Sequence, residues 1–262
     1  SGHNGSAAIM IDGIVTSAVQ EERFCRKKNY VGYPKQAIDF CMAKEKLSGD
    51  ELTFIAFTSD DVGPSIELKA KTSTQFSIRD YMDFYGDKYH ARRMKGESVL
   101  DYYHWLDNDK KFNIDEQYID FSYLNDGVLL DHEKDKEALR CELKRVASTH
   151  LGVAIDKIQF IDHHTCHAFY SYFGSPFRGE DCIVLTLDGW GDGRNQTVWK
   201  VENEKFSLLA DSDQNDIGRI YKMATLILGM RPDEHEFKVM GLAAYAKDSH
   251  VRKAMTVLEN LS

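Results

Sequence analysis

Apolar and polar positions alternate in short blocks at the start of the chain. Residues 7–11 are apolar, Asp12 and Gly13 form a strong turn signal, and residues 14–20 alternate between the two kinds. This arrangement predicts two antiparallel strands joined by a tight hairpin turn. Pro34 then begins a stretch with apolar residues at helical spacing, so we expect a helix there.

The middle of the chain breaks this alternation. Residues 60–151 are rich in Tyr, Asp, Lys and His. Near the end of this region, Leu139, Leu143 and Val146 recur at the spacing of one helix face, which predicts an amphipathic helix over residues 134–150. We interpret the region as a mostly helical insertion into a fold that is built from shorter elements.

The other segments are short strands and helices. The expected strands are residues 52–58, 158–161, 181–187, 195–201 and 205–210, of which 52–58 and 181–187 are predicted to be buried. The expected helices are residues 165–173 and 220–228, with a further helix from Lys238 onward. Strands that alternate with helices are typical of an α/β protein. We therefore expect a first lobe over residues 1–60, the insertion over residues 61–151 and a second part over residues 152–262.

One plan of turn and hairpin occurs twice. The first copy is HNGSAAIMIDGIVTSAV, from His3, and the second is GDGRNQTVWKVENEKFSLL, from Gly191. Duplicated units of this kind are typical of an actin-like, ribonuclease-H-like fold that binds its ligand between two lobes. Two unrelated hairpins would give the same pattern. In the second copy a strand precedes the turn, so the duplication predicts an equivalent strand upstream of Ser1.

Composition and charge narrow the class of protein. The chain has 262 residues, of which 42% are hydrophobic and 29% are charged, as expected for a globular protein. Its formal net charge of -9 disfavours a nucleic-acid partner. No apolar run approaches the roughly 20 residues that span a bilayer, and no signal peptide opens the chain, so no membrane partner is expected. Five scattered cysteines without a CxxC pair favour a reducing cytoplasm.

A histidine cluster is the strongest chemical signal, because DHHTCHAFY holds three histidines within five positions. On a helix, His163 and His167 would lie on one face and hold a single ion, and His164 with His167 is the alternative pair. Asp188 and, across a glycine turn, Asp192 are the candidate carboxylates. Two imidazoles and a carboxylate suit a divalent metal, although the spacing does not select which one. A helix start whose histidines only bond to their neighbours is the competing interpretation.

Two further features have both a chemical and a structural interpretation. In DGWGDG, Gly189 and Gly191 would let backbone amides approach a bound anion, but glycine and aspartate also build ordinary tight turns. His3 precedes the first hairpin, where an imidazole at an interlobe cleft would bind phosphate or act as an acid or base. A solvated terminal histidine is the alternative.

Six motifs in order carry a resemblance to a known family. They are HNGSAAIMIDG, EERFCRKKN followed by YP, DHHTCHAFYSYFGSPF, VLTLDGWGDG, IGRIYKMATLILGM and HEFKVMGLAAYA. Together they resemble the N-terminal domain of the carbamoyltransferases of the nodulation and antibiotic-tailoring type, whereas residues 60–151 contribute little. The resemblance implies an actin-like domain that transfers a carbamoyl group to a hydroxyl of a small-molecule acceptor. It also implies that a separate YrdC-like domain makes the donor, carbamoyl-adenylate, from carbamoyl phosphate and ATP.

The resemblance also implies roles for individual residues. An iron-like divalent ion, most simply Fe(II), would be held by three ligands, His163, His167 and Asp188. His3 would lie in the transfer pocket, and Lys238 and Gly241 would belong to the wall on the nucleotide side.

Later motifs of this family do not occur before Ser262, namely a further metal-binding aspartate, a GG-rich nucleotide segment and the YrdC-like domain. We therefore expect the chain to be part of a longer protein and to be inactive alone. Two other functions remain open. One is another actin-like ATPase or sugar kinase, which HNGS in place of Asp-x-Gly disfavours. The other is a non-catalytic module that binds a metal or a protein partner.

Overall fold

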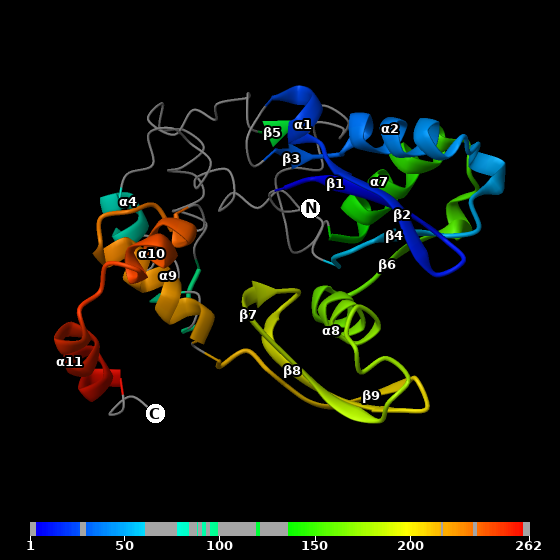
Figure 1. The fold of residues 1–262 in the computed structure, drawn as a ribbon. Coiled ribbons are helices and arrows are strands. Elements are labelled where there is room, and N and C mark those ends of the chain that lie inside the picture. The colour runs from blue at the N-terminus through cyan, green and yellow to red at the C-terminus, as the bar shows by residue number, and fades with distance from the viewer. Residues whose placement is uncertain are drawn as a thin grey trace.

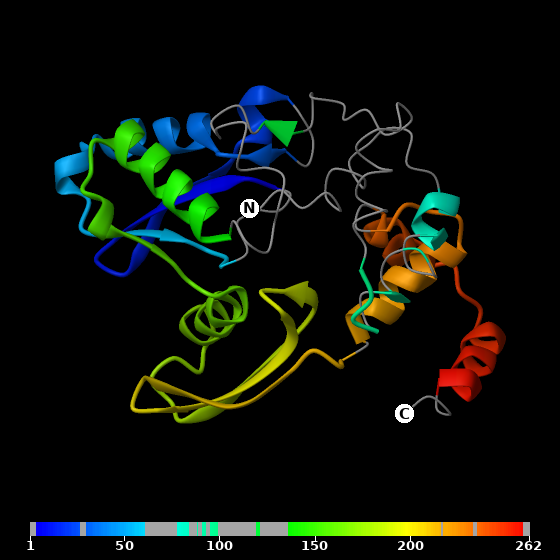
Figure 2. The same cartoon turned by 180° about the vertical axis from the view of Figure 1, so that it is seen from behind.

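The computed structural model describes residues 4–26, 30–60, 78–83, 88, 91–92, 95–98, 119–120, 136–215, 217–232 and 235–258. Its helices and strands form three groups, which can be followed in Figure 1 and, from behind, in Figure 2. One group surrounds the N-terminal hairpin, a second consists of one helix on a three-stranded sheet, and a third contains the C-terminal helices. The expectation of a mixed α/β protein is confirmed.

The N-terminal hairpin forms as the alternation predicts. Strand β1 (Ser6–Ile11) pairs antiparallel with β2 (Ile14–Gln20). Asp12 and Gly13 both have positive φ angles, 50° and 78°, which is the conformation of a type I′ turn. The pairing shifts register once in the middle of the hairpin, so the returning strand carries a β-bulge.

Helix α2 (Lys35–Glu45) packs on this hairpin and begins one residue after the proline that predicts it. Its first backbone N–H groups are capped by Glu21, a buried residue that follows β2. The Glu21 carboxylate accepts the backbone N–H of Gln36 at 3.2 Å and that of Ala37 at 2.7 Å. The charged stretch between β2 and α2 also contains one short helical turn, α1 (Glu22–Cys25).

Two short parallel strand pairs lie beside the hairpin. Strand β3 (Val31–Gly32) pairs with β5 (Ile119–Asp120), and β4 (Ile55–Phe57) pairs with β6 (Ile158–Phe160). The prediction of a buried strand over residues 52–58 is therefore only partly right. Strand β4 is shorter than predicted, and its burial alternates, with Ala56 exposed between the half-buried Ile55 and Phe57, so only one face of the strand is covered.

Helix α7 (Lys136–Leu151) packs against β6, as the amphipathic pattern near residue 143 predicts. The core of this group is formed by Tyr33, Leu143, Ala147, Val153 and Ile158. Most of the expected helical insertion lies outside the described residues. Its described elements are α7, β5 and the short helix α4 (Ile78–Asp83).

Helix α8 (His163–Phe173) lies on an antiparallel sheet of three strands, β7 (Cys182–Gly191), β8 (Arg194–Glu202) and β9 (Lys205–Ser212). The core between helix and sheet contains Ala168, Tyr172, Val184 and Val201. On the opposite face of the sheet, Leu185 is 52% exposed. The prediction of a buried strand over residues 181–187 is wrong for that face, because α8 covers only the other one.

The glycine-rich stretch after this strand also differs from the prediction. We expected a turn over the whole of DGWGDG, but β7 continues through Gly191. The turn is confined to Asp192 and Gly193, with φ angles of 49° and 82°. Cross-strand pairing is interrupted after Leu187 and Gln196 and resumes at the pair Gly191 and Arg194, so residues 188–190 form an irregularity in the strand opposite Asn195.

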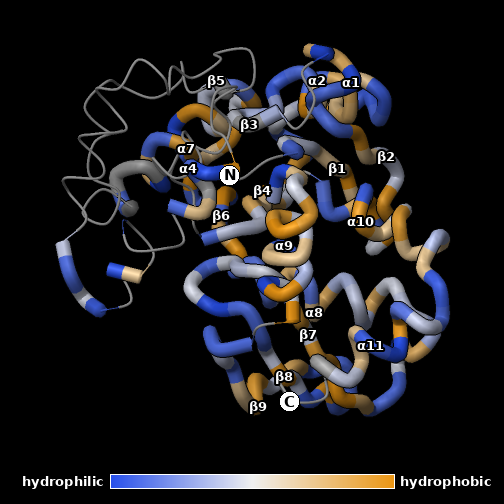
Figure 3. Tube along the Cα trace, turned by 90° about the vertical axis from the view of Figure 1, so that its left-hand side faces the viewer, coloured by the Kyte–Doolittle hydropathy of each residue, from blue (hydrophilic) through white to orange (hydrophobic). Residues whose placement is uncertain are grey.

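The C-terminal helices α9 (Ile217–Ile227), α10 (Glu236–Ala243) and α11 (Asp248–Leu258) make up the third group (Figure 1). Helix α9 packs against β7, and α10 packs against α9. Hydrophobic positions gather along α9 and where α8 meets β7 (Figure 3). Among the described helices, none combines the length and the apolar character that crossing a membrane requires.

Candidate metal centre

The first turn of α8 places the histidine cluster. Asp162 is its N-cap, and the Asp162 Oδ1 atom accepts the backbone N–H of Thr165 at 2.8 Å and the hydroxyl of Thr165 at 3.0 Å. A capping aspartate satisfies a backbone donor that the helix leaves without an intrahelical partner. The helix therefore begins at His163, two residues before the predicted start. His163 and His167 are consequently one helical turn apart on the same face.

The side chains of His163, His167 and Asp188 converge. The Nε2 atom of His163 lies 2.6 Å from Oδ2 of Asp188 and 3.0 Å from Nε2 of His167, and the latter lies 3.5 Å from Asp188 Oδ2. Donor atoms bound to one tetrahedral ion at about 2.0–2.2 Å lie about 3.3–3.6 Å apart. The three residues form the group of potential metal ligands found in the described part of the chain. This is the set that the sequence predicts.

The electrostatics of the group favour a cation. The hydrogen bond to Asp188 raises the pKa of His163 above its usual value, although partial burial opposes the shift. Hydrogen bonds from His163 and His167 hold the pKa of Asp188 well below its usual range. The carboxylate is therefore ionised at neutral pH, and its negative potential favours either a proton on His163 or a metal ion between the side chains.

His164 points away from this group and into the sheet. Its side chain is fully buried, its Nδ1 atom accepts the hydroxyl of Thr186 at 2.7 Å, and its Nε2 atom donates to the carbonyl of Arg194 at 3.1 Å. Burial lowers the pKa of His164, so the ring is neutral. Both ring nitrogens are engaged, which excludes the alternative metal pair of His164 with His167. His164, Ala168 and Tyr172 share the buried face of α8 at four-residue spacing, a signal in the sequence that separates His164 from its neighbours.

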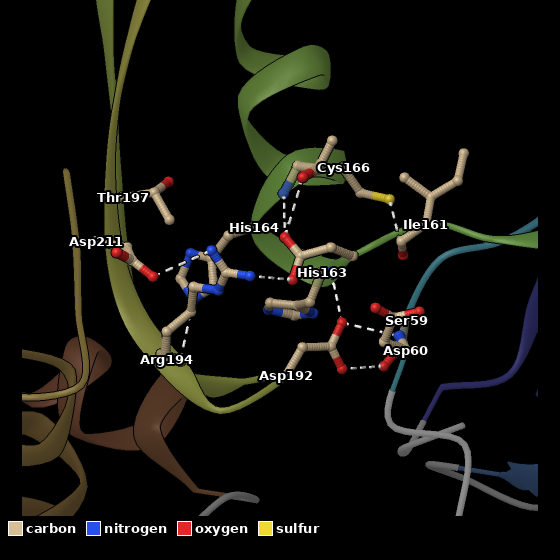
Figure 4. Close-up of polar contacts among 12 residues, drawn as sticks. Ser59, Asp60, Ile161, His163, His164, Cys166, Asp192, Arg194, Thr197 and Asp211 are labelled. Carbon is tan, nitrogen blue, oxygen red and sulfur yellow. Dashed lines mark hydrogen bonds and ion pairs between the residues drawn. The ribbon is translucent and has the colours of Figure 1, made fainter. Parts of the chain in front are cut away.

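Asp192 does not join the ligand group. Its Oδ2 atom accepts the backbone N–H of His163 at 2.6 Å and that of Asp60 at 2.8 Å, and its Oδ1 atom accepts the hydroxyl of Ser59 at 2.8 Å (Figure 4). The carboxylate therefore binds the backbone of two other segments. Sequence reasoning considered Asp192 as a ligand and missed this role, because Ser59 and Asp60 lie far away along the chain.

Two glycines make close contacts in this region, Gly191 with His163 and Gly218 with Gly189. A Cβ atom on Gly191 would lie 2.1 Å from the Cδ2 atom of the His163 ring, so only glycine leaves room for the imidazole. A Cβ on Gly218, at the start of α9, would lie 2.7 Å from the backbone nitrogen of Gly189. The N–H of Gly189 already donates to Oδ1 of its neighbour Asp188 at 2.6 Å. In this structure the absence of a side chain at Gly191 leaves space for the His163 imidazole, and the Gly189 amide donates a hydrogen bond to the Asp188 carboxylate.

The other predicted site residues lie farther away or outside the described residues. Lys238 and Gly241 belong to α10, which is separated from the strand that carries Asp188 by α9. His3 lies outside the described residues. Burial raises the pKa of the Cys166 thiol to about 11, so this cysteine, which lies between His163 and His167 in the sequence, is not a thiolate nucleophile at neutral pH.

Comparison with known proteins relates this geometry to a family. The uncharacterized protein sll1178 of Synechocystis sp. is 26% identical over 99% of this chain, which corresponds to 35% of its own length. The nodulation protein NolNO of Sinorhizobium fredii is 24% identical over 93% of this chain and 28% of its own length. The uncharacterized protein MJ1051 of Methanocaldococcus jannaschii is 23% identical over 95% of this chain, which corresponds to 33% of its own length. The chain thus spans about a third of the length of these relatives.

A family model covers nearly the whole sequence. The model described as the carbamoyltransferase N-terminus matches residues 1–261, which include all three converging side chains. The resemblance that the six sequence motifs carry is therefore confirmed, and the chain belongs to the carbamoyltransferase N-terminal family.

Proposed function

We propose that this chain is the N-terminal, carbamoyl-transferring domain of an O-carbamoyltransferase, which moves a carbamoyl group onto a hydroxyl of a small molecule with the help of a divalent metal ion. The observation that carries the proposal is the convergence of His163, His167 and Asp188 in a chain of the carbamoyltransferase N-terminal family. An acidic chain with this site is suited to a small substrate and not to nucleic acid.

The donor set fits a first-row divalent ion. Two imidazole nitrogens and one carboxylate oxygen suit Fe(II), Zn(II) and Mn(II) to different degrees, and we propose Fe(II) because the family resemblance implies an iron-like ion. When bound, such an ion polarises a carbonyl oxygen or lowers the pKa of a hydroxyl. Its ligands would be His163, His167 and Asp188, and the N–H of Gly189 would keep the carboxylate oriented.

The reaction that we propose needs little covalent chemistry from the protein. The acceptor oxygen attacks the carbamoyl carbon of carbamoyl-adenylate, the bond from that carbon to the phosphate oxygen breaks, and AMP leaves. The hydroxyl proton passes to a base, a role that we propose for His3. Holding acceptor and donor in line supplies much of the acceleration. Lys238 and Gly241 would line the nucleotide side, and a YrdC-like domain of a longer protein would make the donor from carbamoyl phosphate and ATP.

We also propose that the fold is part of an actin-like, duplicated architecture. Asn4 and Asp192 both have positive φ, 66° and 49°, and each precedes a glycine and then a strand. The hairpins that follow, β1–β2 and β8–β9, both carry their bulge in the returning strand. Matching turns and bulges at corresponding places support duplication of one unit. The two units would lie in residues 1–60 and 152–262, on either side of the inserted segment.

The test has a metal arm and a transfer arm. The chain is purified without oxygen, loaded with Fe(II) and assayed for bound iron, together with His163→Ala, His167→Ala and the control His250→Ala, which changes an exposed histidine of α11. We expect iron to be lost in the first two variants and retained in the control. Equal iron in all four proteins would contradict the proposed site.

In the transfer arm, chemically supplied carbamoyl-adenylate and a panel of polyhydroxylated acceptors are incubated with the longest available form of the protein. Mass spectrometry then detects the carbamate ester. Product that depends on His163 supports transferase function. Iron binding without product on any acceptor would instead favour a metal-binding module without transfer activity.

The five free cysteines are consistent with the reducing cytoplasm that we propose as the location of the protein.

A further inference from the structure

We propose that Asp192 is a positioning residue for the metal centre: its carboxylate fastens the first turn of α8 to the end of β4 and thereby sets the place of the His163 imidazole. The inference rests on the proposed function only where it concerns metal affinity. Its structural part, that one carboxylate holds both segments, stands on contacts within the described residues and is tested separately below.

The contacts of Asp192 join three segments that are remote in sequence. Asp192 lies in the turn between β7 and β8, His163 opens α8, and Ser59 with Asp60 follows β4 (Figure 4). Hydrogen bonds to an ionised acceptor are about twice as strong as neutral ones, and the 2.6 Å bond from the His163 N–H is short for this class. The carboxylate also lies at the N-terminus of α8, where negative charge is favourable.

The same turn holds His163 from a second side. Gly191 directly precedes Asp192, and the His163 ring packs on it so closely that a Cβ would overlap the ring. The backbone of His163 is therefore fixed by Asp192 and its imidazole by Gly191. Small displacements of a ligand weaken metal binding, since the donor atoms must converge within a few tenths of an ångström. This dipeptide is placed to prevent such displacements.

Asp60 is in turn connected to helix α7 by polar contacts. The Asp60 backbone carbonyl accepts a hydrogen bond from Arg140 at 3.1 Å, and the two side chains form an ion pair at 3.0 Å. A chain of polar contacts therefore runs from Arg140 through Asp60 and Asp192 to His163. Asp60 and Arg140 flank the long segment between β4 and α7. The position of the His163 ligand is thus tied to both ends of that segment.

Two substitutions separate the carboxylate from the backbone conformation that it needs. Asp192 has a φ of 49°, which both asparagine and glycine tolerate. Asp192→Asn keeps an oxygen that accepts the two backbone N–H groups, and its amide nitrogen donates to the Ser59 hydroxyl. Asp192→Gly keeps the turn and removes every acceptor. The matched control is Asp12→Gly, the same change in the β1–β2 turn, where Asp12 has a φ of 50° and an exposed side chain.

Two measurements are made on all four proteins. The first is Co(II) affinity and visible absorption, with Co(II) as a spectroscopic probe of the ligand set. We expect Asp192→Gly to lower the affinity by about 10–100-fold and to change the Co(II) band shape, as loss of a residue that orients a ligand does. Asp192→Asn should stay within about threefold of the parent, and Asp12→Gly should equal it. Equal affinity of Asp192→Gly and Asp192→Asn would refute the inference.

The second measurement does not depend on metal. Amide hydrogen exchange is followed at His163 and Asp60, with Tyr172 in the same helix as the internal reference. We expect exchange at the first two sites to accelerate at least tenfold in Asp192→Gly, with little change at Tyr172. Unchanged exchange at both sites overturns the positioning role even if the protein binds metal. If exchange responds but the parent binds no Co(II) through His163, the metal proposal fails and the fastening role is retained.

Discussion

The imidazole of His163 packs directly against the backbone of Gly191. A methyl group at Gly191 would lie 2.1 Å from His163 Cδ2, whereas a methyl group at Gly189, two residues earlier on the same strand, would meet no atom within 4 Å. Neither glycine has a positive φ, so alanine fits both backbones. The two positions therefore differ only in whether an added side chain displaces the His163 imidazole.

Gly191→Ala is accordingly expected to lower Fe(II) or Co(II) affinity by at least about tenfold, because the His163 ring must move away from His167 and Asp188. Gly189→Ala is expected to bind metal like the parent. Isothermal titration of both variants under the same buffer checks the prediction. A similar loss of affinity in both would show that the strand end tolerates no side chain, which is not what the described packing predicts.

The neighbouring histidines should differ sharply in their effect on stability. His164→Ala removes a fully buried ring together with its hydrogen bonds to the Thr186 hydroxyl and the Arg194 carbonyl, so the free energy of unfolding should fall by about 2–4 kcal/mol. His167→Ala, at a side chain that is 51% exposed, should change it by less than about 0.5 kcal/mol without metal. Urea unfolding in the presence of a chelator measures both values.

Glu21 should contribute to stability through helix α2. Glu21→Ala removes the acceptor for two backbone N–H groups at the helix start, and the expected loss is about 1–3 kcal/mol of unfolding free energy. Glu51→Ala is the control, since Glu51 also caps a backbone N–H but is solvent-exposed. The loss of unfolding free energy in Glu51→Ala should be clearly smaller than in Glu21→Ala. Thermal and urea unfolding of the two variants, compared with the parent, measure these differences in unfolding free energy.

Tyr33 predicts a dependence of stability on alkaline pH. Burial, and then the nearby carboxylate of Asp39, raises the pKa of Tyr33 well above its usual value, and its hydroxyl is hydrogen-bonded to His150 Nδ1 at 3.0 Å. The folded protein keeps this phenol protonated, whereas an unfolded tyrosine ionises near pH ~10. The contribution is therefore fully present below pH ~10 and is lost as the pH rises toward the folded-state pKa, at up to about 1.4 kcal/mol per pH unit.

Tyr33→Phe should remove that part of the slope. Unfolding free energies of the parent and the variant are compared at several pH values from about 9 to 11. The parent curve should fall more steeply than the variant curve above pH ~10, while a constant offset reflects the lost hydrogen bond to His150. Parallel curves over this range would show that Tyr33 ionises normally in the folded protein.

Sequence alone determined the features that depend on neighbours in the chain. The Asp12–Gly13 pair predicted a tight hairpin turn, and the spacing of His163 and His167 predicted their common face, because turn angles and helical periodicity are local properties. The extent of the turn in DGWGDG was predicted wrongly, because strand pairing is not a local property. Glycine and aspartate favour a turn locally, but pairing with β8 extends the strand to Gly191.

Only the tertiary structure decided what the polar side chains bind. His164 resembles its neighbours in the sequence, yet it faces Thr186 in the sheet, while His163 faces Asp188. Asp192 resembles a second metal ligand, yet it binds the backbone of His163 and Asp60. These contacts join segments separated by 22–132 positions, and hydrogen bonds of this kind depend on distances and directions that composition and spacing do not specify.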